Sequence, residues 1–316
     1  MSALEAPGAD SWQDGALLRQ WESLWEQIWQ RPAAVFARAD HLLTALATAL
    51  DWQPGDWILA DGLLEPCWRQ ACRALWLRLW LVDVDPVTGL SPADAASWPD
   101  HPPRAWLRCH SFGQVADQPR TPSVAVSIEI CSAVPIPVEG CGLADFQIVG
   151  CDGNQAIAAG SACVLLGRDT ALMQTIRRLR HTLPATLSCA IGLSRLQQWP
   201  MLAQRRNKLA QCYLQTLRPK GWFHLPASWP KTWFRFIVNL SCPEDRQSLQ
   251  QWLLRAGIGA GSPVWYAIPE QHRLPGLQQF CQCSLAIPLF ASLDERQQKR
   301  IINRIHRWTK RSVGVQ

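Results

Sequence analysis

The sequence predicts an α/β protein with a mixed, mostly parallel sheet, flanking helices and a small C-terminal α+β lobe. Two short apolar runs, WILA and WLVDVDP, read as buried strands on either side of a helical pattern around residues 64–76. Such alternation is typical of βαβ units. Residues 218–232, RPKGWFHLPASWPKT, are rich in proline and read as a linker. We therefore expect a large α/β domain over 1–217, a linker over 218–232 and a small α+β domain over 233–316.

The composition indicates a soluble globular protein of the cytoplasm. Among the 316 residues, 48% are hydrophobic, which is ordinary. No apolar run is long enough to predict a membrane-spanning helix, and the acidic N-terminal segment does not resemble a signal peptide. Twelve cysteines without a secretion signal predict free thiols in a reducing compartment. Their spacing, and that of the histidines, predicts no metal site.

The net charge of +6 is concentrated near the C-terminus, in KRIINRIHRWTKR. This segment is interpreted either as the solvated face of a terminal helix or as a contact with an anionic partner. We predict no nucleic-acid partner.

Helical periodicity is clearest in the N-terminal part of the chain. Over residues 12–30, apolar side chains recur at spacings of three and four, including two tryptophans on one stripe, Trp21 and Trp25. This stripe packs either within the chain or against another subunit. A second helix is predicted over residues 38–50, with Asp40 as its N-cap. Near the C-terminus, Ser292 and Glu295 have the spacing of a capping box.

Several segments resemble one known family. PGDWILA…WLVDVDPVTGLSP, AWLRCHSFGQVAD, LADFQIVGCDGNQAIAAGSACV and the long stretch AIGLSRLQQWPMLAQRRNKLAQCYLQTL are similar to segments of the DegT/DnrJ/EryC1/StrS sugar aminotransferases. GIGAGSPVWY resembles a later segment of the same family. The resemblance covers roughly residues 38–310, with deletions. It implies a fold like that of the type I PLP-dependent transferases and a place in sugar-nucleotide or polysaccharide biosynthesis.

The same resemblance implies that the usual chemistry is missing. Gln155 falls at the position of the lysine that forms the Schiff base with PLP, and an amide cannot form one. Ile130 falls at the Asp that pairs with the pyridine nitrogen. Glu129 is adjacent, but neighbouring residues of a strand face opposite sides. Arg38, Ala39 and Asp40 replace the Ser-Gly-Thr turn that binds the phosphate, and Asp40 would repel it.

The absence of lysine does not depend on the alignment, because residues 1–207 contain none. Relatives that replace this lysine by histidine are not matched either, since no histidine lies between His110 and His181. We therefore expect no cofactor.

Five residues form a candidate vestigial pocket. His110 and Glu129 are general acid/base candidates if they share a cleft. Asp152, Asn154 and Gln155 lie in the turn that faces the cofactor in the family, so they are candidates for a retained ligand contact.

Three functions remain open. The first is an inactive relative that forms a homodimer, or a heterodimer with an active aminotransferase. The second is a working PLP enzyme that uses another lysine, such as Lys208 or Lys231, or one from a partner chain. The third is a binding module for a nucleotide sugar.

Overall fold

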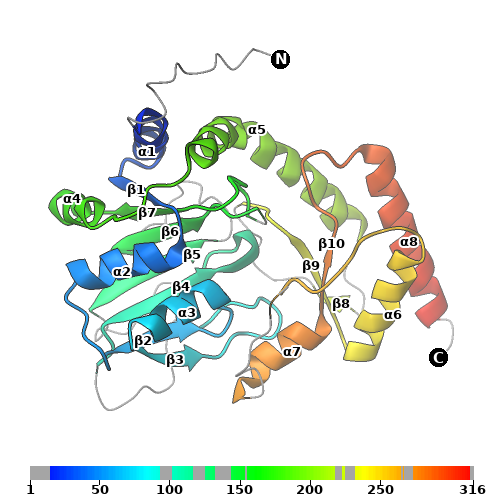
Figure 1. Ribbon diagram of the computed structural model, residues 1–316. Helices are drawn as coiled ribbons and strands as arrows, with labels where there is room; N and C mark the ends of the chain where they lie inside the picture. Colours follow the sequence, from blue (N-terminus) through cyan, green and yellow to red (C-terminus); the bar gives the residue numbers. More distant parts are fainter. Residues whose placement is uncertain are drawn as a thin grey trace.

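The computed structural model describes residues 15–92, 102–116, 125–131, 144–153, 155–217, 223–224, 232–264, 266 and 273–313. Its centre is a seven-stranded sheet with the order β1-β7-β6-β5-β4-β2-β3 (Figure 1). The strands are β1 (Ala33–Phe36), β2 (Trp57–Asp61), β3 (Arg78–Val82), β4 (Ala105–His110), β5 (Val126–Cys131), β6 (Phe146–Gly150) and β7 (Cys163–Gly167). The neighbours from β3 to β6 pair in parallel, whereas β7 pairs antiparallel with both β6 and β1. The predicted mixed, mostly parallel sheet is therefore confirmed.

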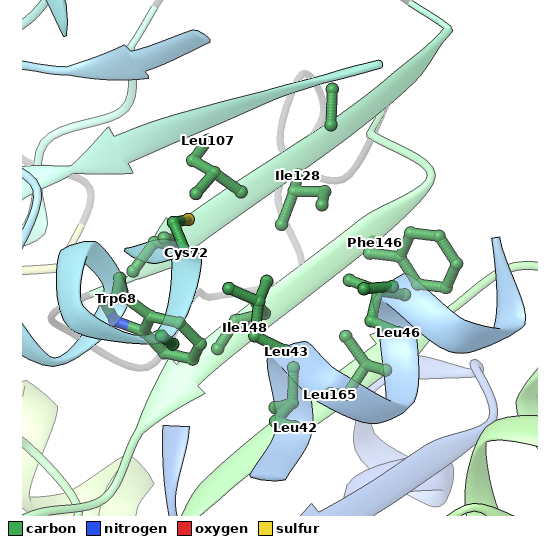
Figure 2. Close-up of a cluster of buried hydrophobic side chains, with 14 of the residues drawn as sticks. Leu42, Leu43, Leu46, Trp68, Cys72, Leu107, Ile128, Phe146, Ile148 and Leu165 are labelled. Carbon is green, nitrogen blue, oxygen red and sulfur yellow. The ribbon is translucent and has the colours of Figure 1, made fainter. Parts of the chain in front are cut away.

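Helices cover both faces of this sheet. The helices α2 (Ala39–Ala49), α3 (Pro66–Ala74) and α4 (Thr170–Arg178) share one apolar cluster with alternate strand residues, among them Leu107, Ile128 and Ile148 (Figure 2). The helices α1 (Ala16–Trp29) and α5 (Thr186–Thr216) share a second cluster with residues that face the other way, such as Val149 and Val164. Because strand side chains alternate between faces, the two clusters make a three-layer arrangement.

Contact between α1 and α5 depends on a glycine. A Cβ atom at Gly192 of α5 would lie 2.2 Å from the fully buried ring of Trp21. The stripe predicted over residues 12–30 thus packs within the chain, as one of the two interpretations proposed. The part of that stretch before residue 15 lies outside the described residues.

The C-terminal part has its own small antiparallel sheet, β10-β9-β8. It comprises β8 (Phe223–His224), β9 (Phe236–Leu240), β10 (Ser284–Ile287), α6 (Pro243–Leu254), α7 (Pro275–Cys283) and α8 (Glu295–Val313). The last turns of α5 pack in the apolar cluster of this part through Leu209 and Tyr213, so α5 connects the two sheets (Figure 1). The domain boundary at residue 217 remains a prediction, and most of the expected linker, 218–232, lies outside the described residues.

Two helix starts differ from the expectation. The N-cap residue of α2 is Arg38, and Asp40 is the second helical residue; its carboxylate accepts two hydrogen bonds from the Arg38 guanidinium, at 2.9 and 2.8 Å. At the start of α8, the reciprocal side-chain bonds join Asp294 and Gln297 rather than Ser292 and Glu295. Within the described part of the chain, no helix combines the length and apolarity needed to cross a bilayer.

Candidate functional site

A small cavity of about 50 Å³ lies at the carboxyl ends of β4, β5 and β6. Ligand sites of open α/β sheets form at this edge. The C-terminal part closes the cavity from the other side. The lining residues are Leu63, Glu65, Trp68, Cys109, His110, Ser111, Phe112, Ile130, Cys131, Gly150, Gln155, Phe234, Arg235, Pro263, Val264 and Tyr266.

Gln155 lines this cavity and forms a hydrogen bond with Glu65, another lining residue. The Gln155 Nε2 donates to Glu65 Oε1 at 3.0 Å, and the Gln155 side chain is buried. It lies directly over Gly150, where a Cβ atom would come within 3.3 Å of Gln155 Cγ. Glu65 is the N-cap residue of α3. Burial raises the pKa of the Glu65 carboxyl, and the bond from Gln155 opposes this effect. The amide and carboxyl therefore form a closed pair across the site.

Ile130 and Glu129 face opposite sides of β5, as the alternation of strand residues requires. Ile130 packs in the apolar cluster beneath α2 and α3, and its side chain reaches the cavity. Glu129 is buried on the other face, where it accepts from Gln147 Nε2 at 2.6 Å. An apolar side chain thus occupies the position that the sequence resemblance assigns to the pyridine-pairing Asp.

His110 and Glu129 come together behind the cavity. His110 Nε2 lies 3.4 Å from Glu129 Oε2, and the Ala116 amide donates to His110 Nδ1 at 3.0 Å. Since Nδ1 accepts this bond, the ring holds its proton on Nε2, toward the carboxylate. His110 lines the cavity, whereas Glu129 lies behind it. This arrangement could move a proton at Nε2.

The remaining residues of the expected pocket are more scattered. Asp152 is exposed and does not line the cavity, and Asn154 lies outside the described residues. Asp145 lies just before β6 and accepts from the amide and hydroxyl of Ser127 at 2.8 and 2.9 Å. Its role is to bond the start of β6 to β5.

Glu65, Arg235 and Tyr266 are among the lining residues that were missed from the sequence. Glu65 precedes Pro66 at the start of α3, a pattern that indicates a helix start but no site. Arg235 and Tyr266 come from the C-terminal part, and only the fold brings them to the cavity. The Tyr266 hydroxyl donates to the Leu63 carbonyl and fixes this closure.

The lining does not fit PLP. No lysine is among the lining residues, Ile130 offers no charge to a ring nitrogen, and the expected phosphate turn holds the Arg38–Asp40 ion pair. A cavity of about 50 Å³ has room for a few water molecules, whereas small-molecule sites have about 300–1,000 Å³. Lys208 is exposed on α5 and does not line the cavity, and Lys231 lies outside the described residues. Among the described residues, no cluster of His, Cys, Asp and Glu could hold a metal ion.

Comparison with known proteins gives one family match, which covers part of the chain. The model of the DegT/DnrJ/EryC1/StrS aminotransferase family matches residues 185–306. No curated protein matches this chain significantly.

Solved structures match over most of the chain. The putative sugar aminotransferase Spr1654 from Streptococcus pneumoniae, in its PMP form, is 14% identical with a TM-score of 0.81, covering 95% of this chain and 92% of its own. The aminotransferase TlmJ from Streptoalloteichus hindustanus is 18% identical with a TM-score of 0.79, at the same two coverages. Helicobacter pylori PseC, an aminotransferase involved in the biosynthesis of pseudoaminic acid, is 14% identical with a TM-score of 0.80, covering 93% and 91%. These matches confirm the fold expected from the sequence, that of the type I PLP-dependent transferases.

Proposed function

Starting from the membership in the DegT/DnrJ/EryC1/StrS aminotransferase family that residues 185–306 indicate, we propose that this chain is a catalytically inactive relative. It acts as a partner or regulatory subunit in sugar-nucleotide or polysaccharide biosynthesis, in the cytoplasm. One observation carries the proposal: the amide of Gln155, which the sequence resemblance assigns to the family's lysine position, is hydrogen-bonded to Glu65 beside a cavity too small for the cofactor.

The chemistry of the lining explains why inactivity is favoured. In PLP-dependent aminotransferases a lysine amine anchors the cofactor, and a negative charge keeps its ring nitrogen protonated, so that it acts as an electron sink. Gln155 supplies no amine, and Ile130 supplies no charge. Glu65 accepts a hydrogen bond from Gln155 and lies at the start of α3, so it does not replace the family's pyridine-pairing Asp, which the resemblance assigns to Ile130 on β5. An active enzyme built on Lys208 is disfavoured because that side chain is exposed away from the cavity lining.

Exposed apolar side chains on α5 support the partner role. Leu187 is 66% exposed, Ile191 36% and Met201 63%, and Leu183 just before the helix is 54% exposed. Leu187 and Ile191 are four residues apart and therefore lie on the same helix face. Contiguous exposed apolar surface is typical of protein interfaces. We propose that this face contacts a second subunit, in a homodimer or in a heterodimer with an active aminotransferase.

Two measurements test the proposal. In the first, the purified chain is incubated with PLP, glutamate and a nucleotide-linked keto sugar, and amino sugar is measured by mass spectrometry beside an active sugar aminotransferase as control. We expect no product from this chain alone. Product formation above the protein-free background would contradict inactivity.

In the second, the molar mass of the chain is measured by light scattering, alone and after co-expression with a sugar aminotransferase. We expect a dimer that the double variant L187S/I191S weakens. The double variant Q197S/Q198S, on exposed residues of the same helix, is the control. A monomer under both conditions would refute the partner role.

A further inference from the structure

Two arginines meet where α5 approaches the small sheet. Arg206 lies on α5, and Arg235 immediately precedes β9. Their guanidinium carbons lie 5.5 and 5.4 Å from the centre of the Phe234 ring. Both side chains are half-buried. Two segments of the fold, α5 and the residues just before β9, therefore hold two positive charges around one aromatic ring.

These charges are not neutralised within the described residues. Arg206 Nη1 donates to the Phe234 carbonyl at 3.2 Å, and Arg235 Nη1 donates to the Pro263 carbonyl at 3.3 Å. No ion pair of the described part includes either arginine, and Arg206 Nε is buried without a hydrogen-bond acceptor there. Glu65 raises the pKa of Arg235 but does not come within ion-pair distance. By contrast, the partly buried Arg177 and Arg180 each pair with a glutamate of α1.

The environment opposes the charge of both groups. Burial lowers the pKa of Arg206, and the nearby charge of Arg235 lowers it further. Burial also lowers the pKa of Arg235. Two like charges removed from water are unfavourable unless an anion joins them. Among the described residues, no acidic side chain forms an ion pair that offsets this cost.

An open groove of about 480 Å³ lies beside the two arginines. Its other walls are the segment Gly259–Ser262 and residues 286–289 at the end of β10. Nothing lies within 4 Å of the positions that a Cβ atom would take at Gly259 and Gly261. The groove therefore has room for a charged group beside bare backbone.

We propose that Arg206 and Arg235 bind a phosphate or pyrophosphate group of a small ligand in this groove. A guanidinium presents paired N–H donors that match the oxygens of a phosphate. A doubly charged oxyanion between the two groups removes their mutual repulsion and supplies the acceptors they lack. The groove shares Phe234 and Arg235 with the lining of the small cavity. The proposal does not rest on the proposed function, because an active or an inactive protein could use this groove.

Calorimetric titration of the full chain with inorganic pyrophosphate at constant ionic strength tests this site. We expect binding that R206Q and R235Q each weaken by about tenfold or more, since each removes charge-assisted hydrogen bonds. The control R195Q removes the same charge from an exposed position of α5 and should change the dissociation constant by less than about twofold.

Melting curves establish that each variant is folded. Should a glutamine variant fail to fold, R206K and R235K are measured in its place. Lysine keeps the charge but loses the paired donors, so we expect these variants to bind pyrophosphate more weakly than the unaltered chain. Absence of pyrophosphate binding, or binding that these variants leave unchanged, would overturn the proposal. Neither result depends on the cofactor or activity experiments above.

Discussion

Replacing Gln155 by Ala removes the amide that donates to Glu65 Oε1 across the cavity. A hydrogen bond to a charged group contributes about 1.5–3 kcal/mol, and a bond between neutral groups about 0.5–1.5 kcal/mol. For the ionised carboxylate of Glu65, we expect Q155A to lower the free energy of unfolding, measured at pH 8, by about 1.5–3 kcal/mol. The exposed Gln197 on α5 is the control, and Q197A should change the free energy of unfolding by less than about 0.5 kcal/mol.

The pH dependence of this loss identifies its cause. Burial already raises the pKa of Glu65 in the folded protein, and the bond from Gln155 lowers it. Without Gln155 the folded-state pKa rises further. A carboxyl with a raised folded-state pKa binds its proton more tightly in the folded state, so stability falls as the pH rises from the unfolded value toward the folded one. The destabilisation by Q155A should therefore be largest at high pH and shrink as Glu65 becomes protonated.

Urea unfolding of Q155A and the unaltered chain, followed by tryptophan fluorescence between pH 5 and pH 8, measures both effects. A difference below about 0.5 kcal/mol at pH 8 would show that the pair across the cavity is not formed. A difference of constant size over this pH range would show that Glu65 is not the group that Gln155 stabilises.

Three further predictions concern the groups around the site and the layer beneath it. E65Q should raise the free energy of unfolding at pH 8 relative to the unaltered chain, because an amide is not ionised. This gain should disappear near pH 4, since the raised pKa of Glu65 lowers stability only above the ordinary carboxyl value of about 4.3. Equal pH profiles of the two proteins in urea titrations would contradict the raised pKa of Glu65. G192A should destabilise the chain by about 1–3 kcal/mol, since the added methyl would overlap the Trp21 ring. The control A190G, at a half-buried position of the same helix, should cost only about 1 kcal/mol. A lower melting temperature for A190G than for G192A would refute the packing of α1 on α5. E22A should cost about 3–5 kcal/mol, because Glu22 accepts from the Val35 amide at 2.8 Å and pairs with the partly buried Arg180. The double variant E22A/R180A should recover part of this loss in the same assay, and a double variant less stable than E22A alone would exclude the unpaired charge of Arg180 as the cause.

The architecture could be predicted from the sequence because its signals are local. WILA and WLVDVDP are short apolar runs that become β2 and β3, with α3 between them. The tryptophan stripe of α1 follows helical spacing. It packs within the chain where Gly192, which has no side chain, leaves room for the Trp21 ring. The N-cap of α2 was predicted wrongly. Asp40 lies inside the first turn of the helix, where its carboxylate accepts from the Arg38 guanidinium instead of capping the helix start. Side-chain propensity alone did not foresee that competing ion pair.

The site was predictable only where it lies on those local segments. Family spacing pointed to Ile130 and Gln155, which line the same cavity, and to His110 and Glu129, which lie 3.4 Å apart. Glu65 could not be found, since its bond to Gln155 joins residues 90 positions apart. The approach of Arg206 and Arg235 to the same ring could not be predicted, because it depends on how α5 packs against the segment before β9. Contacts between distant segments leave no periodic signal in the chain.

Reduction of the PLP-incubated protein with borohydride, followed by mass spectrometry of its peptides, tests the central claim most directly. The five lysines, at positions 208, 220, 231, 299 and 310, make any adduct easy to locate. We predict that no lysine carries a specific phosphopyridoxyl group and that saturating PLP leaves the melting temperature unchanged. A stoichiometric adduct on one lysine, accompanied by a rise in melting temperature, would contradict the closed site that Gln155 and Glu65 form.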